Sequence, residues 1–184
     1  WRTSRALPSA CDPLFAALAE RGILTLEERF VRLRLALDTG NLRLARELNA
    51  RLPEEQGMDA DALERGQKGD EKLLATPMER RGQREAALHA LTQIARNDPA
   101  QAARLWEQHQ AAFTESEQHY GWGQIGLHAA RRHDPQALAW FARAGTSRTE
   151  SQLLWKARAS LRAGNWLETY RTILSMPEAL QEEP

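Results

Sequence analysis

The sequence contains very few of the residues that favour β-strands. Among its 184 residues there is one valine, Val31, and only four isoleucines. β-branched side chains pack well on a pleated sheet, whereas alanine, leucine, arginine, glutamate and glutamine, which dominate here, lose little side-chain entropy in a helix. The composition therefore predicts an all-α protein.

Additional cysteines, long apolar runs and an excess of one charge are also absent. Cys11 is the only cysteine, so no internal disulfide can form. No apolar run approaches the ~20 residues of a membrane-spanning helix, and no signal peptide is visible. Basic and acidic residues number 25 each, which argues against the basic surface typical of nucleic-acid binding. We expect no transmembrane segment and no nucleic-acid partner.

Short turns recur along the chain between segments of helical periodicity. Glycine adopts the left-handed conformation that ends a helix, and proline suits the first turn of the next one. The steps between successive turns are 29, 29, 36 and 30 residues, which accommodate two helices of about a dozen residues each. The turns are Gly40-Asn41, Lys68-Gly69, Asp98-Pro99, Asp134-Pro135 and Gly164-Asn165.

The apolar residues support this repeat. Leu26, Phe30, Leu33 and Leu37 are spaced i, i+4, i+7, i+11, which is one face of a helix. We therefore predict an all-α, right-handed superhelical solenoid of stacked antiparallel helical hairpins, TPR-like, with about 30–36 residues per repeat. Residues 1–184 are expected to form a single repeat domain. Shorter helices are expected in residues 54–82, where glycine and proline interrupt the pattern.

The last hairpin and the tryptophans give more specific packing expectations. Leu154, Ala157 and Leu161 are predicted to pack against Trp166, Tyr170, Ile173 and Leu174. Trp106, Trp122, Trp140, Trp155 and Trp166 lie at or near positions where repeats bury their cores. Core packing is the role we expect for them. The alternative is that a subset faces a glycan, because sugar rings stack on exposed aromatic rings.

Residues 121–126 spell GxGxxG, the glycine pattern of a dinucleotide-binding loop. That mechanism requires a strand before the pattern and a helix whose N-terminus holds the pyrophosphate. No apolar strand precedes Gly121. We interpret the glycines instead as small residues where two helices cross closely.

No complete reactive constellation is visible. The five histidines lack a metal-binding signature, and Glu115, Glu117 and His119 make only a partial ligand set on one helix. The clusters Arg80-Arg81-Arg84 and Arg131-Arg132 are expected to be solvated helix faces. We predict no catalytic residue, no cofactor-binding residue and no metal ligand in this chain, and no cofactor.

Several segments occur in an order that resembles the superhelical, non-catalytic part of soluble peptidoglycan lytic transglycosylases. Ala10-Cys11-Asp12-Pro13-Leu14-Phe15 resembles the opening of that segment, and residues 28–37 resemble the helix that follows. A glycine turn at Gly40-Asn41, a Leu-Pro ending at Leu52-Pro53 and the hairpin of residues 95–105 continue the likeness. The resemblance covers most of the chain and is loosest over residues 54–82.

The resemblance implies a periplasmic or exported protein whose helical hairpins curl into a ring. In that family a lysozyme-like C-terminal domain cleaves the MurNAc–GlcNAc bond without water, using one glutamate first as acid and then as base. Neither Glu115-Ser116 nor Glu150-Ser151 has the downstream partners of that glutamate, so both are expected to be helix starts. The chain, which begins at Trp1, is expected to be a fragment without the catalytic domain.

Two functions from different classes follow. The first is a non-catalytic scaffold that holds or guides peptidoglycan glycan strands and supports the absent catalytic domain. The second is a helical-repeat adaptor that binds another protein along its concave face. An independent enzyme built from this chain alone is disfavoured, because its residues show no reactive constellation.

Overall fold

The computed structural model describes residues 2–59, 61–146 and 149–181, and this part of the chain contains helices and no strand. Short 3₁₀ turns at Ser9–Cys11 and Gln110–Ala112 flank two of the α-helices. The α-helices are α1 Asp12–Glu20, α2 Leu26–Asp38, α3 Leu42–Asn49, α4 Ala62–Gln67, α5 Lys72–Ala75, α6 Arg81–Asn97, α7 Pro99–His109, α8 Glu115–Arg131, α9 Ala137–Arg143, α10 Glu150–Arg162, α11 Trp166–Leu174 and α12 Glu178–Gln181.

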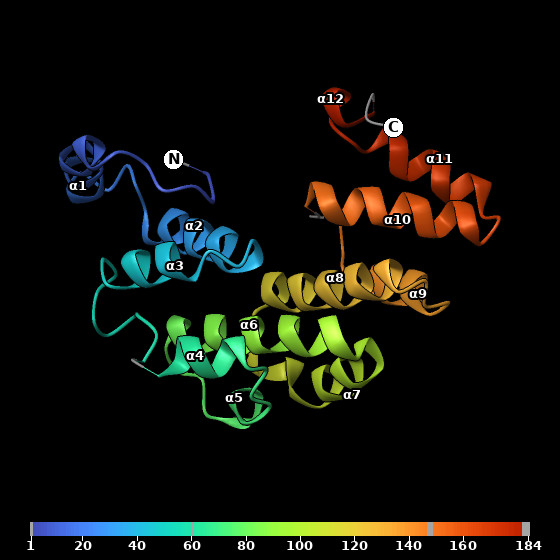
Figure 1. Ribbon diagram of the computed structural model, residues 1–184, viewed down its shortest axis with the longest axis horizontal. Helices are drawn as coiled ribbons and strands as arrows, with labels where there is room; N and C mark the ends of the chain where they lie inside the picture. The colour runs from blue at the N-terminus through green and yellow to red at the C-terminus, as the bar shows by residue number, and fades with distance from the viewer. Residues whose placement is uncertain (1, 60, 147–148, 182–184) are drawn as a thin grey trace.

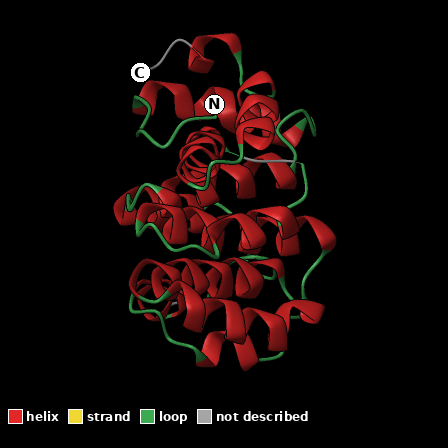
Figure 2. Cartoon of the chain, turned by 90° about the vertical axis from the view of Figure 1, so that its right-hand side faces the viewer, coloured by secondary structure: helices red, strands yellow, loops and turns green. Residues whose placement is uncertain are grey.

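Consecutive helices form antiparallel hairpins, and the hairpins stack in layers (Figure 2). The first helices of the long hairpins pack in a row, α2 on α6, α6 on α8 and α8 on α10. The second helices, α3, α7, α9 and α11, each pack on their own partner. The stack forms an arc with α1–α3 on one arm, α10–α12 on the other and α4–α9 at the base (Figure 1). The all-α solenoid predicted from the sequence is confirmed.

Polar side chains define where many of the helices begin. The side-chain oxygens of Thr25, Asn41, Asp98, Thr114 and Thr149 each accept a hydrogen bond from a backbone N–H in the following helical turn. Such caps satisfy amides that have no partner inside the helix. The five predicted turns all separate two helices, and the glycines at three of them have φ near +70°.

Residues 54–82, where glycine and proline interrupt the apolar pattern, contain a short hairpin. Helices α4 and α5 are short, as predicted, and they pack against α6 rather than continuing the row from α2. Gly82, at the start of α6, lies very close to the loop before α4: a Cβ at this position would be 2.2 Å from the Gly57 backbone. The two segments therefore meet at a point where only glycine fits.

The three glycines of the GxGxxG pattern lie inside α8 and let three other elements approach it. A Cβ at Gly121 would lie 2.5 Å from the Trp106 ring of α7, and one at Gly126 would lie 2.9 Å from the Phe141 ring of α9. A Cβ at Gly123 would lie 2.6 Å from the Gln152 amide of α10. The interpretation of these glycines as helix-crossing residues is confirmed, and α8 is the centre of the stack.

The predicted core is largely correct for the first four hairpins and wrong for the last. Phe30, Leu33 and Leu37 are buried, whereas Leu26 is exposed. In α11 the predicted inward residues point outward, with Trp166 70% and Tyr170 61% exposed. The buried side chains of this helix are Thr169 and Thr172. Leu161, Ile173 and Leu174 are exposed as well, and Leu154 and Ala157 are only partly buried.

The Arg80-Arg81-Arg84 cluster is not the solvated face that the sequence predicts. Arg81 pairs with Glu27 of α2, and Arg84 donates to the buried Glu117 of α8 at 3.0 Å. Arg80 pairs with Asp59 in the loop before α4. These arginines tie α6 to three neighbouring elements, because a guanidinium presents several donors in a fixed geometry.

Candidate functional site

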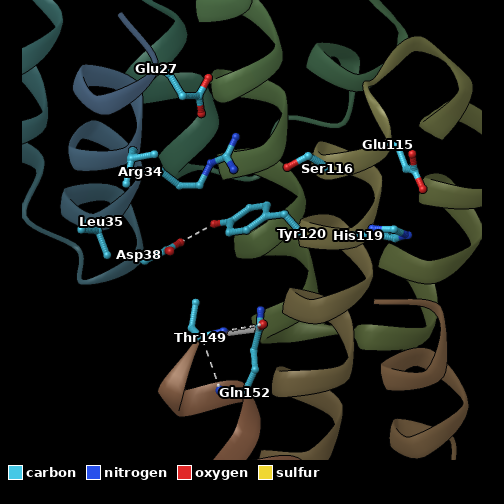
Figure 3. Close-up of a pocket in the computed structure, with 11 residues that line it drawn as sticks. Glu27, Arg34, Leu35, Asp38, Glu115, Ser116, His119, Tyr120, Thr149 and Gln152 are labelled. Atoms are coloured by element: carbon cyan, nitrogen blue, oxygen red, sulfur yellow. Dashed lines mark hydrogen bonds between the residues drawn. The ribbon is translucent and has the colours of Figure 1, made fainter. Parts of the chain in front are cut away.

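A cavity lined mainly by polar side chains lies on the inner side of the arc, between α2, α8 and the start of α10 (Figure 3). Its volume is about 470 Å³, which lies within the range of small-ligand pockets. Lining side chains come from positions far apart in the sequence, which the stacking of first helices brings together. They are Glu27, Val31, Arg34, Leu35, Asp38, Glu115, Ser116, His119, Tyr120, Thr149 and Gln152.

A buried ion pair forms one wall of the cavity. Arg34 donates from Nε to Glu85 Oε2 at 2.9 Å and from Nη2 to Glu85 Oε1 at 2.6 Å. The Arg34 guanidinium also lies 4.4 Å from the centroid of the Tyr120 ring. Burial opposes the charged form of Arg34, but the Glu85 carboxylate outweighs it and raises the pKa of Arg34. The pair therefore holds α2, α6 and α8 in one arrangement.

Asp38, at the end of α2, forms a second polar group beside this pair. Its carboxylate accepts hydrogen bonds from the Tyr120 hydroxyl and, at 3.5 Å, from Gln124 Nε2. Burial raises the pKa of Asp38 to about 6, and burial together with this carboxylate raises the pKa of Tyr120 well above its usual value. No basic side chain of the described residues forms a salt bridge with Asp38. Neutral donors therefore make its hydrogen bonds, while the nearby charges of Arg34 and Arg96 also favour its ionised form.

The opposite wall is the N-terminus of α10. Thr149 caps this helix, and Gln152 Oε1 accepts from the Thr149 backbone N–H at 3.1 Å, completing a capping box. Gln152 is only 2% exposed, and its Nε2 has no hydrogen-bond partner in the part of the chain that the structure describes. Figure 3 shows the amide end of Gln152 directed from α10 toward the space below Tyr120.

The two Glu-Ser pairs behave as predicted. Glu115 and Ser116 begin α8 after the Thr114 cap, and Glu150 and Ser151 begin α10 after the Thr149 cap. The first pair lines the cavity, but Glu115 points away from Tyr120 and Asp38 (Figure 3). Both glutamates act at helix starts, where the helix dipole favours negative charge.

The histidines are not gathered into one site. His119 lines the cavity, whereas His89 of α6 and His128 of α8 are buried and do not line it. Burial lowers the pKa of His89 to about 4 and that of His128 to about 3. Glu117, which the sequence placed near His119, is instead paired with Arg84. Among the described residues, no group of three or more His, Cys, Asp or Glu side chains is arranged to hold a metal ion.

The tryptophans divide into buried and exposed residues. Trp106, Trp122 and Trp140 are buried, as predicted for core positions. Trp155 is partly buried and packs against the core. Trp166 contradicts the core prediction, because it is 70% exposed on α11. None of these tryptophans lines the inner cavity.

Sequence reasoning missed the side chains that define the cavity. Arg34 and Glu85 are 51 positions apart, and Asp38 and Tyr120 are 82 positions apart. A weak signal existed, since Glu85 precedes the apolar Ala86-Ala87-Leu88 on a helix that the pattern buries. A charged residue at such a position requires a partner, but periodicity does not identify it.

The fold and the cavity together define a helical-repeat protein with a polar pocket on its inner side. No protein-family profile matches the sequence, and no curated protein matches it. A solved structure does match, that of an inactive mutant of the lytic transglycosylase Slt from Pseudomonas aeruginosa. The match covers 100% of this chain at 28% sequence identity with a TM-score of 0.63. It covers 31% of the Slt chain, so this chain spans about a third of that protein.

None of the helices in the described residues is both long enough and apolar enough to cross a membrane. The match to Slt shows that the helical arrangement is lytic transglycosylase-like.

Proposed function

We propose that this chain is part of the superhelical, non-catalytic region of a periplasmic lytic transglycosylase. In this proposal residues 1–184 form one repeat domain that holds or guides peptidoglycan glycan strands. A lysozyme-like domain elsewhere in the parent protein then cleaves the MurNAc–GlcNAc bond. The observation that carries the proposal is the match to Slt over the whole chain, at 28% identity and a TM-score of 0.63.

The geometry supports a holding role for the inner side of the arc. Polar side chains from α2, α8 and α10 line the cavity there, and they include carboxylate, amide, hydroxyl and imidazole groups. Such groups offer both donors and acceptors to a hydroxyl-rich polymer. The Arg34–Glu85 pair fixes the helices behind them, so the surface is preorganised for binding.

Co-sedimentation with purified sacculi tests this function. We expect the chain to be retained at low salt above the level of a globular control protein of similar size and near-zero net charge. Retention equal to that of the control would contradict glycan binding by this region.

A second candidate is a helical-repeat adaptor that binds a protein. The observation that favours it is the exposed apolar face of α11, where Trp166, Leu167, Tyr170 and Leu174 are each more than half exposed. Exposed apolar patches of this kind mark interaction surfaces. The variants Trp166→Ser and Leu174→Ser test this candidate. If they abolish retention on sacculi that still carry bound proteins but leave retention on peptide-free glycan unchanged, the apolar face of α11 binds a protein partner.

A further inference from the structure

One carboxylate oxygen of Asp38, which lines the inner cavity, accepts no hydrogen bond from the described part of the chain. The Tyr120 hydroxyl and, at 3.5 Å, Gln124 Nε2 both donate to Oδ1, which leaves Oδ2 as an acceptor. The described side-chain atoms that are both unbonded and fully enclosed do not include Asp38 Oδ2, so this oxygen keeps accessible surface. Figure 3 shows Asp38 at the edge of the open space between the end of α2 and Thr149. A ligand in the cavity can therefore donate a hydrogen bond to Oδ2.

The side of α2 that leads to this carboxylate is aliphatic. Val31, Leu35 and Asp38 are spaced i, i+4, i+7 and all line the cavity, so they lie on one face of the helix. The strip from Val31 to Asp38 is about 10 Å long, because a helix rises about 1.5 Å per residue. An apolar strip with an acceptor at its end fits an alkyl chain that carries a donor at one end.

Two of the charged side chains in the cavity are already balanced by a partner. Glu27 pairs with Arg81 of α6, and Arg34 donates two hydrogen bonds to Glu85. The Arg34 guanidinium is the only arginine group in the lining, and its charge is taken up by Glu85. An anionic ligand is therefore disfavoured.

The remaining charges favour a cationic donor. Asp38 and Glu115 line the cavity, and neither forms a salt bridge with a described residue. Arg96 approaches Asp38 from α6 and donates to its backbone carbonyl at 3.1 Å, but Arg96 does not line the cavity. A hydrogen bond from a cation to a carboxylate is roughly twice as strong as one between neutral groups. An ammonium group on the cavity side therefore gains more from Asp38 than a hydroxyl does.

We propose that the inner cavity binds a primary alkylammonium group, whose nitrogen donates to Asp38 Oδ2 and whose alkyl chain lies along Val31 and Leu35. The side chain of a diamino acid in a peptide and a free diamine both carry this group. That the peptide source is peptidoglycan rests on the proposed function, whereas the charge and shape of the ligand are argued from the lining side chains.

Titration calorimetry with three probes at pH 7.5 tests the proposal. Nα-acetyl-lysine methylamide represents the peptide source, and cadaverine represents the free diamine. Nα-acetyl-norleucine methylamide is the control, because its unbranched side chain has the same carbons as lysine but no ammonium group. We expect saturable binding of at least one amine, and binding of the norleucine probe that is about tenfold weaker or undetectable. Binding of the lysine probe alone assigns the peptide source, and binding of cadaverine alone assigns the free diamine.

The variant Asp38→Asn removes the charge but keeps an oxygen that can accept from Tyr120. We therefore expect a folded chain, checked by circular dichroism, whose amine binding is about tenfold weaker. Glu54→Gln removes a carboxylate from an exposed position outside the cavity and should leave binding unchanged. Should Asp38→Asn lose helicity, Val31→Thr is the second variant. It makes the wall polar at nearly constant size and is expected to weaken amine binding by about fourfold, the equivalent of one buried methylene group.

The proposal is overturned if neither amine binds, if the norleucine probe binds as tightly as the amines, or if Asp38→Asn binds the amine as well as Glu54→Gln does. Retention of the unmodified chain on sacculi without amine binding would reject this site and leave the proposed function standing. Amine binding without retention on sacculi would support this site and reject the proposed function.

Discussion

Arg34 of α2 and Glu85 of α6 form a two-point ion pair in which Glu85 is 1% exposed and Arg34 is 18% exposed. Replacing Arg34 leaves the buried Glu85 carboxylate with only its longer contact to Arg81 Nε, at 3.4 Å. We expect Arg34→Met to lower the free energy of unfolding by about 3–5 kcal/mol, measured by urea denaturation.

The double variant Arg34→Met with Glu85→Leu should recover much of this loss, because no unpaired charge remains. Arg43→Ala is the control, since Arg43 pairs with Glu47 while 91% exposed, and it should change stability by less than about 1 kcal/mol. Equal losses for Arg34→Met and Arg43→Ala would show that the inner pair does not organise the stack.

The glycines offer a graded test of the packing around α8. Gly82→Ala would place a methyl group against the Gly57 backbone, and Gly121→Ala would place one against the Trp106 ring. We expect each to cost about 3 kcal/mol, because neither neighbour can move easily. Gly123→Ala meets the end of the flexible Gln152 side chain and should cost about 1 kcal/mol. Thermal unfolding, monitored by circular dichroism, ranks the three variants by stability. If Gly123→Ala were less stable than Gly82→Ala and Gly121→Ala, the packing described around α8 would be contradicted.

Two buried histidines should make the fold sensitive to mild acid. Burial, with smaller contributions from Arg96, lowers the pKa of His89 to about 4 and that of His128 to about 3. Both values lie below the ordinary value near 6.5, so stability is complete above pH 6.5 and is lost as pH falls toward 4. Each histidine should contribute a loss of about 2 kcal/mol between pH 7.5 and 5.0.

Urea denaturation at these two pH values measures the loss, and His128→Gln should remove about half of it. A pH-independent free energy of unfolding in this window would contradict burial of the two rings.

The contribution of Asp38 to the free energy of unfolding should have the opposite pH dependence to that of the two histidines. Its folded-state pKa of about 6 lies above the ordinary value near 4, so its contribution to stability falls as pH rises from 4 to 6 and is constant above that. The groups around it are Tyr120, Arg34, Glu85 and Arg96. We expect Asp38→Asn to be more favourable relative to the unmodified chain at pH 7.5 than at pH 5.0, by about 1 kcal/mol. An unchanged difference between the two pH values would place Asp38 in solvent.

The sequence was informative about hairpins because their signals are local. Gly40, Asp98 and Gly164 mark turns through backbone conformation and capping, which depend on a few neighbouring residues. Apolar spacing also identified Phe30 and Trp106 as core residues. These properties are determined within one or two helical turns, so no knowledge of the tertiary arrangement is needed.

The last hairpin and the cavity were not predictable in the same way. Periodicity identifies the apolar face of α11 but does not say whether another helix covers it, and in this structure Thr169 and Thr172 face inward instead of Trp166 and Tyr170. The cavity depends on pairs such as Asp38 and Tyr120, which meet only after four hairpins have stacked. Each of these residues has an ordinary helical context in the sequence, so its partner could be found only in the fold.

The central claim is that this helical stack binds peptidoglycan glycan strands. Titration calorimetry with peptide-free glycan chains of defined length tests it most directly, with cellulose oligomers of equal length as the control. We predict saturable binding of the glycan chains and much weaker or undetectable binding of the cellulose oligomers. Glycan chains that give no saturable heat, or that bind no better than the cellulose oligomers, would contradict the claim.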